Sequence, residues 1–119
     1  MIFLSFISLF AQTIDLKITT FNVEWLSCIN NGPTNEQQQE NNIVSLIQTI
    51  NPDITALQEV GTSTTYATID TLVKKLGINE WAGAIVATTH TNCGQNQGII
   101  YKKSHLQLVN SSRYSVGKN

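Results

Sequence analysis

The stretch Asn51-Pro52-Asp53-Ile54-Thr55-Ala56-Leu57-Gln58-Glu59-Val60 decides how this chain folds. Pro52 ends any helix that precedes it, because the residue before a proline is pushed out of the helical region. The run from Ile54 to Val60 is short and largely apolar, which is typical of a buried strand. Glu59 lies near the end of this run, so the sequence predicts a buried strand that delivers a carboxylate to its carboxyl end.

Upstream of Pro52 the apolar residues change period. Residues 14–23 alternate between apolar and polar side chains, which predicts a strand that reaches Asn22 near its end. Thr34 and Gln37 have the spacing of a capping box, which predicts the start of a helix. The helix then has one apolar stripe for packing on a sheet, made of Ile43, Leu46, Ile47 and Ile50.

Downstream, Ser63 or Thr64 is placed to cap a second helix, and Gly77 is placed to end it. The apolar stripe of this helix consists of Tyr66, Ile69, Leu72, Val73 and Leu76. Strands are predicted over residues 81–89, 99–102 and 106–109, with a polar loop over residues 91–97. Helices between strands predict an α/β fold, with the helices on one face of the sheet and the other face uncovered.

Length and composition limit the alternatives. The chain has 119 residues, of which 41% are hydrophobic, enough to fill the core of one domain and to argue against a disordered chain. Seven Lys and Arg residues oppose eight Asp and Glu residues, for a net charge of −1. The composition therefore carries no basic surplus of the kind that favours nucleic-acid binding by phosphate neutralisation.

Residues 1–12 differ from the rest of the sequence. They form an uncharged apolar run that ends in Ala11 and Gln12, with the length of a signal-peptide core and too short to span a bilayer. No Lys or Arg precedes the run, and a buried apolar strand is the alternative interpretation. We expect an export signal over residues 1–12, a domain over residues 13–119, no transmembrane segment, and a secreted or periplasmic location.

Cys28 and Cys93 are the two cysteines of the sequence. An exported protein could join them in a disulfide, and two unrelated thiols are the alternative. A zinc site would need histidine partners, and His90 and His105 do not have the ligand spacing for one.

Asn22 and Glu59 are the candidate site residues. The amide of Asn22 could bond a phosphate oxygen or a metal-bound water, or it could satisfy the backbone of the following turn. A carboxylate at the end of a buried strand is costly unless it is paired or bound to a cation, although Glu59 could also be solvated at a strand tip. Mg²⁺ binds through one or two carboxylates together with waters and substrate phosphate oxygens, which suits a single glutamate.

These residues lie in motifs that resemble the start of the endonuclease/exonuclease/phosphatase superfamily, which is also described as DNase I-like. The first motif is Thr20-Phe21-Asn22-Val23 and the second, more specific one is Pro52-Asp53-Ile54-Thr55-Ala56-Leu57-Gln58-Glu59-Val60. A third, Gln97-Gly98-Ile99-Ile100-Tyr101, is similar to the family's next strand. The resemblance covers roughly residues 15–109 and implies the N-terminal half of a two-layered α/β sandwich.

The resemblance also implies a chemistry. Glu59 would be the ligand of Mg²⁺, with Mn²⁺ as an alternative, and Asn22 would act close to the metal and the phosphate. The implied reaction is metal-assisted attack of water on a phosphoester, of the nuclease or phosphodiesterase type, so nucleic acid is one of the expected substrates.

Two elements of the family pattern are missing from the 119 residues. The family's Asp-x-Asn and Asp-His elements have no counterpart, and His90 and His105 match no catalytic context, so we interpret both as surface histidines. We therefore expect an N-terminal fragment of a phosphoester hydrolase that is inactive on its own. The alternatives are a non-catalytic binding module that uses its polar loop over residues 91–97, and a vestigial α/β protein without a metal.

Overall fold

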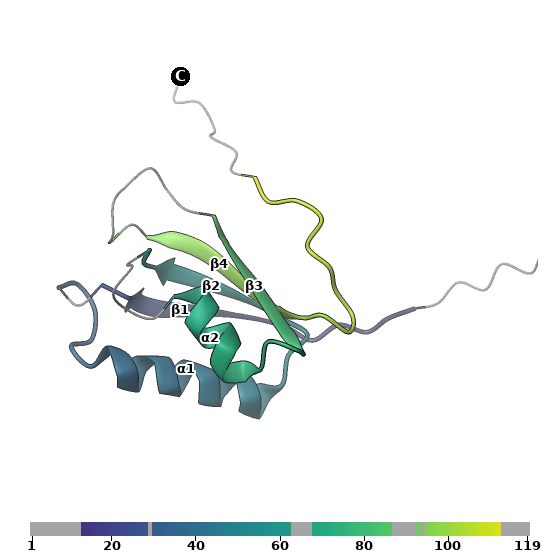
Figure 1. Ribbon diagram of the computed structural model, residues 1–119, viewed down its shortest axis with the longest axis horizontal. Coiled ribbons are helices and arrows are strands. Elements are labelled where there is room, and N and C mark those ends of the chain that lie inside the picture. The colour runs from purple at the N-terminus through teal and green to yellow at the C-terminus, as the bar shows by residue number, and fades with distance from the viewer. Residues whose placement is uncertain (1–12, 29, 63–67, 87–92, 94, 113–119) are drawn as a thin grey trace, which may run out of the picture.

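The computed structural model describes residues 13–28, 30–62, 68–86, 93 and 95–112. Two helices and four strands succeed one another in this part of the chain, as Figure 1 shows. In chain order they are β1 (Ile18–Leu26), α1 (Glu36–Ile50), β2 (Ile54–Val60), α2 (Ile69–Leu76), β3 (Trp81–Val86) and β4 (Asn96–Lys102). The predicted α/β class is confirmed.

The four strands form one mixed sheet in the order β1-β2-β4-β3. β1 and β2 run parallel, with Ile18 aligned with Ile54 and Asn22 aligned with Gln58. β4 runs antiparallel to both of its neighbours, β2 and β3. The parallel pair is joined through α1, as a parallel connection requires a crossover. The carboxyl ends of β1 and β2 therefore meet at one edge of the sheet.

Both helices pack on the same face of the sheet (Figure 1). The core between them and the sheet contains Leu57 of β2 and Ile100 of β4, each with no exposed surface. No helix or strand of the described part of the chain covers the opposite face, where Ile54, Ala56 and Gln58 are partly exposed. The predicted one-sided arrangement of helices is therefore confirmed for these residues.

Helix α1 is held by a cap at each end. The N-cap is Asn35, whose Oδ1 accepts the Gln38 N–H at 3.0 Å, so the prediction of a cap at Thr34 was wrong by one residue. At the other end Asn51 adopts the left-handed conformation with φ 52°, and its N–H donates to the Ile47 carbonyl. The short polar side chain of asparagine tolerates this conformation, and Pro52 then prevents the helix from continuing.

The buried stripe of α1 differs from the predicted one. Ile43, Val44 and Ile47 are buried against the sheet, whereas Leu46 is 44% exposed. A spacing of three or four residues allows more than one stripe on a helix, and the position of the sheet decides which stripe is buried.

Helix α2 begins later than predicted. Its N-cap is Thr68, whose N–H donates to Thr71 Oγ1 at 3.4 Å, and Gly77 ends it with φ 111°. Ser63, Thr64 and Tyr66 lie outside the described residues. Ile69 and Leu72 are buried as predicted, and Gly98 in β4 allows Ile69 to come close, since an added Cβ there would lie 2.7 Å from Ile69 Cδ1.

The observed strands differ from the predicted ones in where they begin and end. The first strand covers Ile18–Leu26, and β4 begins at Asn96, inside the segment predicted to be a loop. Residues 106–109 form no strand, and Val109 is 92% exposed, because an alternating pattern forms a strand only where a partner strand is available. The predicted third strand is observed over Trp81–Val86, and residues 87–89 lie outside the described part. No helix in the described ranges is long and apolar enough to cross a bilayer.

Candidate functional site

Asn22 and Glu59 lie at the same edge of the sheet. Asn22 of β1 is aligned with Gln58 of β2 in the parallel register, and Glu59 is the next residue of β2. The two candidate residues, 37 positions apart in the sequence, are therefore neighbours across adjacent strands. Their roles in metal or phosphate binding stay predictions.

Asn22 is exposed, and its side chain bonds the backbone of the next turn. Its Oδ1 accepts the Glu24 N–H at 2.9 Å, which is the local bond that the sequence allows as an alternative role. The bond orients the carboxamide and leaves its NH₂ group as a donor that faces no other described partner. An amide donor suits a phosphate oxygen or a metal-bound water.

Glu59 has an unusual backbone for a residue in a strand. Its φ is 62°, in the left-handed region, which costs an L-residue about 1–2 kcal/mol. Its side chain is half-buried, and no hydrogen bond or ion pair joins its carboxylate to another described residue. A carboxylate that has no partner among the described residues is available to bind a cation.

The backbone of Glu59 belongs to a β-bulge. Gln58 is aligned with Gln97 and Val60 with Asn96, so β2 advances two residues where β4 advances one. Leu57 and Val60 both lie in the core although three residues separate them, which a regular strand with alternating faces does not allow. The bulge therefore returns Val60 to the core and removes Glu59 from the alternation.

The end of β1 is irregular at the same level. Between Asn22 and Leu26 the strand advances four residues while β2 advances two. Glu24, Trp25 and Ser27 have φ of 48°, 60° and 68°. With Glu59, these are four of the five non-glycine residues with positive φ among the described residues, and such residues cluster at functional sites.

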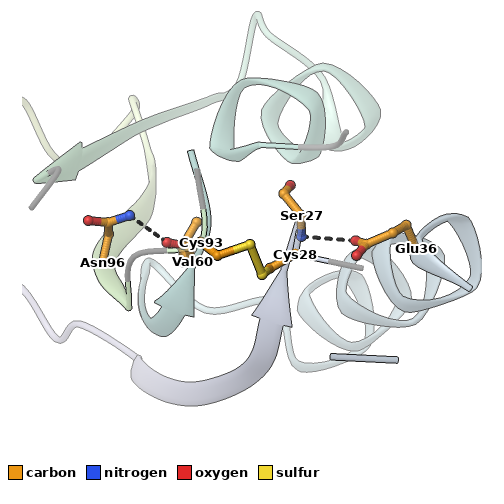
Figure 2. The surroundings of a disulfide bond; sticks show 6 residues. All are labelled: Ser27, Cys28, Glu36, Val60, Cys93 and Asn96. Atoms are coloured by element: carbon orange, nitrogen blue, oxygen red, sulfur yellow. Dashed lines mark hydrogen bonds between the residues drawn. A yellow bond between two sulfur atoms is a disulfide. The ribbon is translucent and has the colours of Figure 1, made fainter. Parts of the chain in front are cut away.

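Hydrogen bonds join the irregular end of β2 to both of its neighbouring strands. The Asn96 Nδ2 donates to the Val60 carbonyl at 2.8 Å, and the Gly61 N–H donates to the Leu26 carbonyl at 2.7 Å. Figure 2 shows the Asn96 bond on one side of the disulfide between Cys28 and Cys93, a pairing that the sequence leaves open. Sequence reasoning missed Asn96 because a single asparagine in a polar loop carries no periodic signal.

On the other side of the disulfide, α1 is attached to the end of β1 (Figure 2). The buried Glu36 carboxylate accepts the Ser27 N–H at 2.9 Å. Glu36 lies in the first turn of α1, where the helix dipole favours a negative charge. The Gln39 Nε2 donates to the carbonyl oxygen of Glu24 at 2.9 Å and also to that of Val23. These bonds give the strand end a fixed position although its backbone is irregular.

A groove of about 590 Å³ adjoins Asn22 between β1 and α1. Five carboxamide side chains line it, and Glu24 is its one ionisable lining residue. The carboxamides are those of Asn22, Asn35, Gln38, Gln39 and Asn42. Because a carboxamide both donates and accepts, the groove suits a neutral hydrogen-bonding ligand.

His105 lies at the opposite edge of the sheet. Its Nδ1 is 3.0 Å from Asp53 Oδ1, and its side chain is 47% exposed, so the interpretation as a surface histidine is confirmed. The N–H of Lys17 donates to Asp53 Oδ2 at 2.8 Å and, together with His105, lowers the pKa of the Asp53 carboxyl. His90 lies outside the described residues.

The donor set at the Asn22–Glu59 edge suits Mg²⁺. No group of three or more His, Cys, Asp or Glu residues that could hold a metal occurs within the described ranges. Mg²⁺ does not need such a cage, because it keeps several waters and is bound through one or two carboxylates and the phosphates of the substrate. Glu59 would hold the cation, and Asn22 would bond the phosphate or a metal-bound water.

Comparison with known proteins shows the fold. No protein-family model and no curated protein matches the sequence. A crystal structure of the endonuclease/exonuclease/phosphatase from Bacteroides vulgatus is similar, with a TM-score of 0.51 and 19% sequence identity over 77% of this chain. This chain covers 33% of that one, about a third of its length. The described part of this chain thus has the fold of a portion of an endonuclease/exonuclease/phosphatase protein.

Proposed function

We propose that this chain carries the metal- and phosphate-binding edge of a Mg²⁺-dependent phosphoester hydrolase of the nuclease or phosphodiesterase type. The observation that carries the proposal is the Glu59 carboxylate, which has no partner among the described residues. It is held at φ 62° near the carboxyl end of β2, one residue past the register partner of Asn22 in the parallel strand β1. Backbone held in a costly conformation is retained where it serves a function. The fold shared with the Bacteroides vulgatus protein supports the same proposal.

Glu59 and Asn22 have different roles at this edge. Glu59 holds the cation, and the NH₂ group of Asn22 donates to a phosphate oxygen, so that the phosphoester is fixed in one orientation. The bound cation would supply electrophilic stabilisation of the charge that develops on the phosphoryl oxygens. Nucleic acid, a nucleotide or another phosphoester would fit this chemistry, and Mn²⁺ would be able to replace Mg²⁺.

No histidine among the described residues lies at this edge. His105, the histidine of the described part, lies at the opposite edge and is bound to Asp53. We therefore propose that the chain binds metal and phosphate but does not turn over substrate by itself, as an N-terminal part of the complete catalytic unit.

Metal binding by Glu59 is testable without turnover. The electron paramagnetic resonance signal of free Mn²⁺, titrated against the protein, measures binding directly. We expect saturable binding by the unsubstituted chain and its loss in Glu59→Gln, which keeps the size of the side chain but removes its charge. Glu80→Gln is the control, because Glu80 is exposed and precedes β3 at the opposite edge. Equal binding by both variants would rule out Glu59 as the ligand.

The groove between β1 and α1 favours a second function, a non-catalytic binding module. Its five carboxamides and about 590 Å³ of space suit a neutral polar ligand such as a carbohydrate. This function needs no metal, so binding of ligand that chelator and Glu59→Gln leave unchanged would favour it over the hydrolase.

An exported location is also proposed. The disulfide between Cys28 and Cys93 supports it, because disulfides persist in oxidising compartments such as the periplasm and the cell exterior. The apolar run over residues 1–12, outside the described part, would be the export signal. Mass spectrometry of the protein recovered from outside the cytoplasm would show whether these residues are removed.

A further inference from the structure

We infer that Asn96 is a positioning residue for Glu59: its carboxamide fixes the β-bulge that holds the Glu59 carboxylate at the edge of the sheet. The consequence for metal binding rests on the proposed function, whereas the effect on the Glu59 backbone does not. Asn96 acts through the backbone of β2, because its Nδ2 bonds the Val60 carbonyl.

The bulge needs a constraint, because Glu59 alone does not favour it. Left-handed backbone at the first residue of such a bulge is usually supplied by glycine, which has no Cβ. Here the residue is a glutamate with φ 62°, and the conformation persists only if its surroundings over-determine it.

Asn96 supplies that constraint from the neighbouring strand. It is fully buried, and its Nδ2 donates at 2.8 Å to the carbonyl of Val60, the residue directly after the bulge. Asn96 is also the register partner of Val60, so the bond fixes β4 to β2 at the point where the register shifts. The N–H of Gly61 donates to the Leu26 carbonyl and so fixes β2 to β1, its other neighbour, just after the bulge.

The pleat of β2 predicts how the strand changes if the constraint is lost. Leu57 faces the helices, so in a regular strand Glu59 would face them too and Val60 would face the uncovered side. Without the Asn96 bond, Glu59 can return to an extended backbone, and its carboxylate then leaves the edge beside Asn22. The bond therefore selects the backbone that presents the carboxylate at the edge.

The test compares Asn96→Leu with Thr55→Val. Leucine has the same number of side-chain heavy atoms as asparagine and branches at the same carbon, but it has no donor. Thr55 is equally buried and loses a hydroxyl bond to Thr19 at 2.9 Å, in the same strand as Glu59 but away from the bulge. Asn96→Leu removes the bond to Val60 and Thr55→Val removes the bond to Thr19, and the two variants differ in whether the bond removed reaches the bulge.

Two measurements are needed. A strong intraresidue NOE between the amide and Hα protons of Glu59 indicates a positive φ, and Mn²⁺ titration measures how tightly the protein binds the metal. We expect Asn96→Leu to weaken the NOE and to raise the Kd for Mn²⁺ about tenfold or more, as residues behind metal ligands do. Thr55→Val should change neither. If Asn96→Leu does not fold, Asn96→Ser, whose hydroxyl is too short to reach the Val60 carbonyl, replaces it.

The two proposals fail in different ways. An unchanged Glu59 NOE in the folded Asn96 variant would overturn the positioning role, whatever the metal result. A protein that binds no Mn²⁺ at all would overturn the proposed function, while the NOE would still decide the role of Asn96.

Discussion

Asp53 joins three strands at one corner of the sheet. Its Oδ2 accepts the N–H of Lys17 at 2.8 Å, ahead of β1, and its own carbonyl accepts the N–H of Lys102 in β4. His105 lies 3.0 Å from Oδ1 and the Lys102 Nζ 4.0 Å from it. A single residue at the start of β2 therefore fixes the starting point of the register that aligns Asn22 with Gln58.

This contact makes the stability of the fold depend on pH. The Lys17 N–H, and then His105, lower the pKa of Asp53 below its ordinary value of 3.8. A carboxyl with a lowered pKa in the folded state stabilises the fold above its ordinary pKa, and that contribution is lost as the pH falls through the folded pKa. We expect Asp53→Asn to lower the urea midpoint at neutral pH, with a difference from the unsubstituted chain that shrinks below pH 3.8.

The matched control for Asp53 is Asp15→Asn, because Asp15 is exposed ahead of β1. Urea unfolding monitored by circular dichroism, at neutral pH and again below pH 3.8, provides the measurement. A difference between Asp53→Asn and the unsubstituted chain that stays constant with pH would contradict the assigned role of the carboxylate.

At the scale of elements, substitutions in α1 test which of its faces packs on the sheet. Ile47 is fully buried in the core, and its neighbour Leu46 is 44% exposed beside the groove. A buried, unpaired carboxylate is costly, so Ile47→Asp should leave the chain unfolded or lower its stability by more than about 4 kcal/mol. Leu46→Asp is the control and should change the stability by about 1 kcal/mol or less.

Circular dichroism and urea unfolding of these two α1 variants compare adjacent residues with the same new side chain. Similar losses of stability in both would mean that α1 packs on the sheet through a different stripe.

The sequence predicted α1 itself, because its capping signals and apolar spacing are local. The sequence did not show that Val44 is buried and Leu46 is exposed, because which residues are buried depends on where the sheet lies relative to the helix axis.

For the molecule as a whole, the disulfide links the end of β1 to the segment before β4. Cys28 and Cys93 are 65 positions apart, and Cys28 is buried. A closed loop of this length stabilises the fold by about 4 kcal/mol in the chain-entropy account. Reduction should therefore lower the free energy of unfolding by about that amount, a large share of the roughly 5–15 kcal/mol typical of a domain.

The measurement for the disulfide is urea unfolding with and without a thiol reductant. The double variant Cys28→Ser, Cys93→Ser should unfold at the midpoint of the reduced protein and should not respond to the reductant. Equal midpoints for the oxidised and reduced protein would contradict the expected contribution.

The sequence by itself determined the α/β class, the order of the six elements from β1 to β4, and the placement of Asn22 in the first strand and of Glu59 near the end of the second. These properties arise from spacings of two to four residues, from caps and from Pro52, all of which act within a short window of the chain. The motif that resembles the endonuclease/exonuclease/phosphatase superfamily supplied the expected chemistry on the same residues.

Only the tertiary structure decided the shape of the candidate site. The left-handed backbone of Glu59, the bond from Asn96 to Val60, and the disulfide each depend on the register between segments that are distant in the sequence. The exposed segment over residues 106–109 has a strand pattern but no strand partner among the described residues. Local patterns specify what a segment can form, and pairing between distant segments decides what it does form, because register and burial are properties of the assembled sheet.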